Sequence, residues 1–187
     1  MDRLPLCGID EAGRGPLAGP LIMTGVILKE KIDGLADSKQ LSEKRREILF
    51  SQIIQVAHYC IVRFSPEEID TIGISKCLSR GLRQIQRELP KAHYLFDGNS
   101  TFGVANIKTM VKADTKIPEV SAASILAKVT RDREMIEMAN IYSKYGFERH
   151  KGYATKAHYE ALLRYGRCFI HRKSFYVKGL DEIMLFK

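Results

Sequence analysis

The chain has 187 residues, which fits one domain large enough to bury a hydrophobic core without disulfide or metal staples. Hydrophobic residues make up 45% and charged residues 28%, a balance that excludes a disordered or fibrous protein. Lysine and arginine outnumber aspartate and glutamate by 30 to 22, giving a net charge of +8. This excess suits a polyanionic partner such as nucleic acid, although solubility alone would also explain it.

The sequence also bears on compartment and metal chemistry. The longest apolar run, residues 21–28, is too short to cross a bilayer, and the first five residues carry no export signal. We therefore expect a soluble, cytoplasmic protein with no membrane partner. The cysteines are too widely spaced for a zinc site or disulfide framework, which predicts reduced thiols at Cys7, Cys60, Cys77 and Cys168. Any metal should then bind carboxylates, the ligands of magnesium and manganese.

The first part of the chain is rich in strand signals. Apolar runs predict strands at residues 6–9 and 21–28, separated by a glycine-rich turn at 13–19. Residues 29–40 are polar and predict a loop. Ser42 is a suitable N-cap for a helix whose apolar positions follow helical spacing.

Strands and helices alternate in the middle of the chain, and helices close it. The further predicted elements are a strand at 59–64, a helix starting at Ser65-Pro66, a helix over 74–89, strands at 94–96 and 106–111, and helices over 119–145 and 155–165. We find no repeat or linker, so we predict one domain over residues 1–187, with a helical C-terminal part from about residue 155. The pattern predicts an α/β fold, a mixed sheet flanked by helices.

Acidic residues stand where two predicted strands end. Asp10 and Glu11 directly follow the first strand, and Asp97 ends the strand at 94–96. Each has an ordinary explanation, because Asp10 suits a loop and Asp97 suits a turn before Gly98. Neighbouring strand residues point to opposite faces, so Asp10 and Glu11 are not expected to reach one site in the same way.

A fourth acid, Asp132, interrupts an apolar helix face. It shares that face with Ile125, Val129 and Ile136, at spacings of four, three and four residues. Burying an unpaired carboxylate is costly, so Asp132 needs either one of the arginines beside it in the sequence or a metal ion.

Together these acids predict a metal-dependent nuclease. A cluster of like charges repels itself unless divalent cations neutralise it. Two ions about 4 Å apart can hold an attacking water and a leaving oxygen for in-line phosphodiester cleavage. This hypothesis explains both the acids and the basic composition.

Six short blocks of the chain resemble, in order, the motifs of bacterial ribonuclease HII. The first is residues 10–20, DEAGRGPLAGP, and the others are residues 37–41 (DSKQL), 96–99 (FDGN), 113–132 (AD…SAASILAKVTRD), 152–158 (GYAT…H) and 171–175 (HRKSF). The match spans roughly residues 6–175. One block would be weak evidence, whereas six in sequence are specific.

The resemblance implies a ribonuclease H-like fold and a metal-dependent endonuclease. Such an enzyme cleaves RNA in RNA–DNA hybrids and incises 5′ to a single ribonucleotide embedded in duplex DNA, leaving 5′-phosphate and 3′-hydroxyl ends. The acids that match would form the catalytic set and hold two magnesium or manganese ions: Asp10, Glu11, Asp97 and Asp132.

Other residues of the blocks are candidates for substrate binding. Gly13, Arg14 and Gly15 let the backbone approach a sugar closely, although they could simply form a tight turn. Tyr153 follows a glycine, and the resemblance implies that it senses the ribose and its 2′-hydroxyl. Without the resemblance, packing would be the commoner role for such a tyrosine.

Basic residues supply candidate phosphate ligands. Arg14, Lys39 and Lys128 belong to the blocks, and Lys128 precedes Asp132 by one helical turn. A wider set predicts a basic platform for duplex DNA near the C-terminus: Lys144, Arg149, His150, Lys151, Arg164, Arg167, Arg172 and Lys173.

Residues 182–186 faintly resemble sliding-clamp-binding peptides, with Glu182 where glutamine is usual, but a final strand or helix packed on the domain is the favoured interpretation. We expect a monomer.

Three alternative functions remain. Ribonuclease HIII has an extra N-terminal domain, for which residues 1–9 leave no room. A junction resolvase would not need Gly13-Arg14-Gly15 or Tyr153, and a basic binding module would use the acids only structurally.

Overall fold

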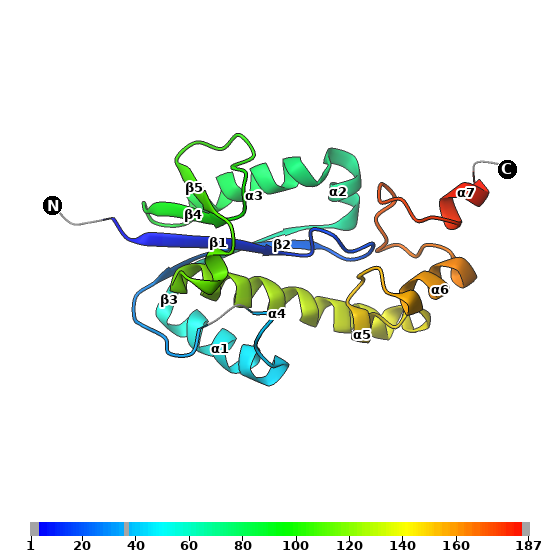
Figure 1. Ribbon diagram of the computed structural model, residues 1–187, viewed down its shortest axis with the longest axis horizontal. Coiled ribbons are helices and arrows are strands. Elements are labelled where there is room, and N and C mark those ends of the chain that lie inside the picture. Colours follow the sequence, from blue (N-terminus) through cyan, green and yellow to red (C-terminus); the bar gives the residue numbers. More distant parts are fainter. Residues whose placement is uncertain (1–3, 36–37, 185–187) are drawn as a thin grey trace.

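The computed structural model describes residues 4–35 and 38–184 and contains one five-stranded mixed sheet (Figure 1). The strand order is β3-β2-β1-β4-β5. The pairs β1–β2 and β2–β3 are antiparallel, whereas β1–β4 and β4–β5 are parallel. The strands are β1 (Leu6–Ala12), β2 (Leu21–Leu28), β3 (Ala57–Phe64), β4 (His93–Asp97) and β5 (Ile107–Met110).

Helices cover both faces of the sheet, as predicted. The pair α2 and α3 lies on one face, α1 and α4 lie on the other, and α5, α6 and α7 extend beyond one end of the sheet (Figure 1). Their bounds are α1 (Glu43–Val56), α2 (Pro66–Ile72), α3 (Ile74–Glu88), α4 (Pro118–Ile141), α5 (Phe147–His150), α6 (Lys156–Tyr165) and α7 (Leu180–Met184), with 3-10 turns η1 (Ala113–Thr115) and η2 (Ser143–Tyr145).

The central strand β1 is buried between two hydrophobic clusters. Cys7 and Ile9 belong to the cluster beneath α2 and α3, while Val26 of β2 joins the cluster beneath α1 and α4. A third cluster connects the far end of α4 to the C-terminal helices through Met135 and Ala139. Helix α4 thus packs on the sheet with its first half and on the C-terminal helices with its second half.

Three predicted helix starts are confirmed by their caps. The hydroxyls of Ser42, Ser65 and Thr155 each accept a hydrogen bond from a backbone N–H three residues later. At Ser65 the Glu68 carboxylate returns a bond to the Ser65 N–H, completing a capping box.

Most element boundaries differ from prediction by one or two residues, and those of β1 and α4 differ by more. Strand β1 continues to Ala12, so Asp10 and Glu11 lie inside the strand, paired with Thr24 and Met23 of β2. Helix α4 ends at Ile141 rather than at residue 145. Tyr145 instead packs its ring on Phe147, at a centroid distance of 5.4 Å, in the third cluster.

The C-terminal part is less helical than predicted, because residues 166–179 contain no helix. Polar side chains hold this segment instead. The Asp70 carboxylate accepts hydrogen bonds from the backbone N–H groups of Lys173 and Ser174, and Arg167 pairs with Asp181.

The predicted apolar face of α4 is correct only in its first half. Ile125 and Val129 are buried, but Ile136 is 38% exposed. Beyond Val129 the buried positions are Arg131, Met135 and Ala139, since this half of the helix packs on the third cluster rather than on the sheet. Among the residues that the structure describes, no helix is long and apolar enough to span a membrane.

Candidate active site

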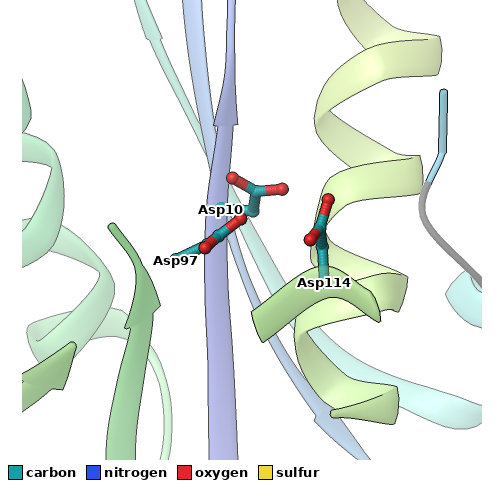
Figure 2. Close-up of side chains that lie close together, drawn as sticks. All are labelled: Asp10, Asp97 and Asp114. Carbon is teal, nitrogen blue, oxygen red and sulfur yellow. The ribbon is translucent and has the colours of Figure 1, made fainter. Parts of the chain in front are cut away.

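Three aspartates converge beside the central strand. Asp10 comes from β1, Asp97 from the end of β4 and Asp114 from η1, and their side chains point toward one another (Figure 2). One carboxylate oxygen from each lies within 4.8 Å of the others. Within residues 4–35 and 38–184 this is the group whose spacing suits a metal ion.

The sheet topology explains this convergence. Strands β4 and β5 are parallel, so their carboxyl ends meet at one edge of the sheet. Asp97 is the last residue of β4, and Asp114 follows β5 by four residues. The Ala113 N–H donates to Asp97 Oδ1 at 3.1 Å, and the Ser121 hydroxyl bonds the Asp114 carbonyl, which ties the turn to both elements.

The environment of Asp10 disfavours its charge. The residue is 8% exposed, and burial together with the charges of Glu11 and Asp97 raises the pKa of the Asp10 carboxyl well above its usual range. The Glu11 N–H, which donates to Asp10 Oδ1 at 2.7 Å, and the Ser124 hydroxyl act in the opposite direction.

Glu11 lies next to this group and shares its cleft. One oxygen, Oε1, pairs with Arg14 at 2.7 Å, whereas Oε2 is buried without a hydrogen-bond partner among the described residues. Burial raises the pKa of the Glu11 carboxyl to about 7, although the Arg14 guanidinium lowers it. A buried carboxylate oxygen without a hydrogen-bond partner is costly, so this oxygen is suited to bind a cation.

The donor set fits hard divalent cations. Carboxylate oxygens are the ligands that magnesium and manganese prefer, and the residues around them include no thiol or imidazole. A bound cation would offset the mutual repulsion that now disfavours the ionised forms of Asp10 and Glu11.

Asp132, the fourth acid of the sequence prediction, lies outside this group. Its carboxylate pairs with Lys128 at 2.9 Å, one turn earlier on α4, rather than with the neighbouring arginines. The structure instead brings Asp114 into the cluster. Asp114 lies in the fourth sequence block, and its place shortly after a strand parallel to β4 is the signal that could have identified it.

The six residues predicted to bind substrate line one cleft of about 600 Å³ together with Asp10, Glu11 and Asp97. They are Gly13, Arg14, Gly15, Lys39, Lys128 and Tyr153. Lys112 also lines the cleft and was not predicted. Its backbone is left-handed, with φ of +57°, an unusual conformation for lysine that directs the chain from β5 into η1. Asp37, from the second block, lies outside the described residues.

Two buried arginines hold the glycine-rich segment from beneath. Arg172 donates to the carbonyls of Gly13, Arg14 and Gly19, and Arg131 donates to those of Ala18 and Pro20. Both arginines are fully buried. Arg172 therefore cannot belong to the basic surface platform, a correction to the sequence prediction.

Comparisons with known proteins identify the family to which the chain belongs. The family model described as Ribonuclease HII matches residues 7–178. The chain belongs to the ribonuclease HII family. It is 70% identical over 182 residues to Ribonuclease HII of Sulfurovum sp. (strain NBC37-1), covering 97% of each chain. It is 54% identical to Ribonuclease HII of Aliarcobacter butzleri, covering 95% of this chain and 93% of that one.

Solved structures of ribonucleases share the fold. The enzyme in the PCNA:RNase HII complex from Archaeoglobus fulgidus is 29% identical, with a TM-score of 0.78 over 90% of this chain and 92% of that chain. Ribonuclease H2 from Pyrococcus horikoshii is also 29% identical, with a TM-score of 0.76 over 98% and 100%. As a ribonuclease HII family member, the protein is a metal-dependent endonuclease that acts on RNA–DNA hybrids.

Proposed function

We propose that this ribonuclease HII family member also incises duplex DNA 5′ to a single embedded ribonucleotide and leaves 5′-phosphate and 3′-hydroxyl ends. The observation that carries the proposal is the cleft that Asp10, Glu11 and Asp97 line together with the glycine-rich segment and Tyr153. Such a cleft can place a phosphodiester at the acids while Tyr153 and the glycine-rich segment contact the adjacent ribose.

In this proposal Asp10, Glu11, Asp97 and Asp114 hold two magnesium or manganese ions. The unpartnered Glu11 oxygen and the 4.8 Å grouping of the three aspartates support this set over one that includes Asp132. When bound, the ions would supply Lewis-acid stabilisation and a nucleophile at neutral pH. Lys128, paired with Asp132, then serves as a phosphate ligand held at the cleft.

The chain's own groups would select the ribose. A side-chain carbon added at Gly15 would meet no atom within 4 Å, so the backbone there is open to a sugar. Tyr153 is 41% exposed at the cleft, with its ring 5.3 Å from the Arg131 guanidinium. A ring held in this way can pack on the ribose, while its hydroxyl or nearby backbone groups bond the 2′-hydroxyl.

The proposed platform for duplex DNA is smaller than the sequence predicted. Arg172 is buried, and Arg167 is mostly buried and paired with Asp181. The exposed members that remain support a phosphate-binding face: Lys144, Arg149, Arg164 and Lys173.

Partners and location remain predictions. The Archaeoglobus enzyme forms a complex with PCNA, and we propose that residues 182–186 of this chain provide a comparable clamp contact. Leu185 and Phe186 lie outside the described residues. We further propose a cytoplasmic monomer comprising one catalytic domain.

A DNA duplex with one embedded ribonucleotide, incubated with and without magnesium or manganese, tests the main proposal. We expect incision 5′ to the ribonucleotide only with metal, and 5′-phosphate ends on mapping. Cleavage of a continuous hybrid without incision at the single ribonucleotide would overturn the proposed substrate while leaving the family activity intact.

A further inference from the structure

A buried histidine pair lies beneath the loop that carries Tyr153. His158 on α6 is fully buried, and His171 in the segment after α6 is 2% exposed. Their Nε2 atoms lie 3.0 Å apart. Neither residue touches the acid cleft, and the proposed reaction does not use them.

The pair joins three segments that meet behind the cleft. The Leu17 N–H donates to the Gly152 carbonyl, and the Arg172 N–H donates to the Leu17 carbonyl. Ala18 forms an isolated β-bridge with His171. The histidines therefore connect the Tyr153 loop to the glycine-rich segment and to the segment after α6.

Hydrogen bonds assign one proton to each ring. His158 Nδ1 lies 2.9 Å from the Tyr153 carbonyl oxygen, which can only accept, so His158 donates from Nδ1. His171 Nδ1 lies 2.9 Å from the Cys168 backbone nitrogen, 3.1 Å from the Cys168 sulfur and 3.3 Å from the Cys168 carbonyl oxygen. The backbone N–H can only donate and makes the shortest of these contacts, so we assign Nδ1 as its acceptor and place the His171 proton on Nε2. His171 Nε2–H then donates to the bare Nε2 of His158, and the chain is complete.

The surroundings favour two neutral rings. Burial lowers the pKa of both His158 and His171 to about 4, and for His171 the charge of His158 acts in the same direction. His150 stacks on His158 with a centroid distance of 4.4 Å, and Phe147 packs against His158 edge to face. A proton added to either histidine would set two N–H groups against each other.

We propose that His158 and His171 are positioning residues that fix Tyr153 for ribose recognition. His158 holds the Tyr153 carbonyl, and His171 keeps His158 in the donating tautomer. The side chain of Tyr153 is then placed at the cleft from two sides, by its anchored backbone and by Arg131 beneath its ring. This inference rests on the proposed function, in which Tyr153 contacts the ribose.

Amide substitutions separate positioning from simple packing. The amide nitrogen of asparagine can occupy the place of Nδ1, and that of glutamine the place of Nε2. We therefore expect His158→Asn to keep the bond to Tyr153 and His158→Gln to lose it. At position 171 the preference reverses, because His171→Gln keeps the donor toward His158 and His171→Asn does not.

The kinetic readout is kcat and KM on the duplex with one embedded ribonucleotide. We expect His158→Gln and His171→Asn to lower kcat about tenfold with KM changed less than about threefold, because a small displacement of a positioning group costs mainly rate. The reciprocal variants should stay within about threefold of wild type. In a Tyr153→Ala background, His158→Gln should lower kcat no further.

Controls keep the test decisive. His58 is exposed on β3, and His58→Gln should change nothing. In substrate-free protein, NMR of the imidazole nitrogens should show Nδ1–H at His158 and Nε2–H at His171, and the Tyr153 ring signals should move in His158→Gln but not in His158→Asn. The NMR measurement does not depend on activity. If the wild-type protein fails to incise the ribonucleotide-containing duplex with metal present, that result refutes the proposed function but not the positioning of Tyr153. Equal effects of Asn and Gln at either position, or additive loss with Tyr153→Ala, would overturn the positioning role.

Discussion

The guanidinium of Arg172 donates a 2.6 Å hydrogen bond to the carbonyl of Gly13, 159 residues earlier in the chain. Burial and the charge of Arg131 lower the pKa of Arg172 to about 9. Two buried cations therefore bind the carbonyls of the glycine-rich segment, and among the described residues neither forms an ion pair with a carboxylate. The segment presents its opposite side to the cleft that holds the acids.

The two glycines of the Gly13-Arg14-Gly15 segment should respond differently to alanine. Gly13 has φ of +93°, and an added Cβ would lie 2.2 Å from Arg131 Nε and 2.5 Å from the Pro20 oxygen. We expect Gly13→Ala to lower the free energy of unfolding by about 2 kcal/mol or more. Gly15→Ala should change it by less than about 0.5 kcal/mol.

Denaturant unfolding and incision assays check this pair. If Gly15 approaches the sugar, Gly15→Ala will lower activity on the ribonucleotide-containing duplex while its unfolding curve stays unchanged. If Gly13→Ala has the same free energy of unfolding as wild type, the close approach of the added Cβ to Arg131 does not destabilise the fold.

Asp114→Asn and Asp132→Asn distinguish the two candidates for the fourth catalytic acid. Asp114 belongs to the three-aspartate group, so its substitution should lower kcat on the order of 10²–10³-fold by removing charge from the site. Asp132 pairs with Lys128, so Asp132→Asn should cost about tenfold or less. Single-turnover cleavage of a hybrid measures both. A larger loss for Asp132→Asn would reverse the assignment.

Asp10→Asn should stabilise the metal-free protein. The substitution removes one charge from a buried cluster in which Glu11 and Asp97 repel it, and the asparagine can still accept from the Glu11 N–H. We expect a gain of about 1 kcal/mol in the free energy of unfolding with chelator present. Saturating manganese should raise the melting temperature of wild type but much less that of the variant.

Asp33→Asn is the matched control, because Asp33 is an exposed acid paired with Lys31. It should show the wild-type response to manganese. A metal-free Asp10→Asn protein less stable than wild type would mean that burial and repulsion of the Asp10 charge do not determine the stability of this site.

The histidine pair predicts how stability depends on pH. The folded pKa values of His158 and His171 are about 4, below the ordinary 6.5, so the unfolded chain binds more protons between these values. Their contribution is therefore fully present above pH 6.5 and is lost as the pH falls toward 4. Urea unfolding from pH 7 to 4.5 should show a shallower decline for His158→Asn than for wild type. Parallel declines would contradict the assignment of two neutral rings.

Local sequence signals predicted most elements of the fold. Apolar runs located the strands, and capping residues such as Ser42 and Ser65 located the starts of helices, because both depend on neighbours within a few residues. Boundaries set by distant contacts were missed. Tyr145 lies beyond the end of α4, where its hydroxyl donates to the Gly166 carbonyl and its ring contacts His171, and no neighbouring residue signals these contacts.

The group of neighbouring acids was predicted in part. Asp10, Glu11 and Asp97 stand out because acids at predicted strand ends break an apolar pattern. Asp132 is predicted because helical spacing places it on one face with Ile125, Val129 and Ile136. That face is not buried beyond Val129, since the second half of α4 packs on the C-terminal cluster.

The sequence by itself determined the family, the α/β class and the chemistry of a carboxylate-rich nuclease, because residue types and short motifs are local properties. Only the tertiary structure decided which carboxylates meet, since the parallel pairing of β4 and β5 brings Asp97 and Asp114 to one edge. It also decided that Arg172 faces inward rather than toward DNA. Burial of a charge depends on segments far away in the chain, and no spacing along the sequence encodes it.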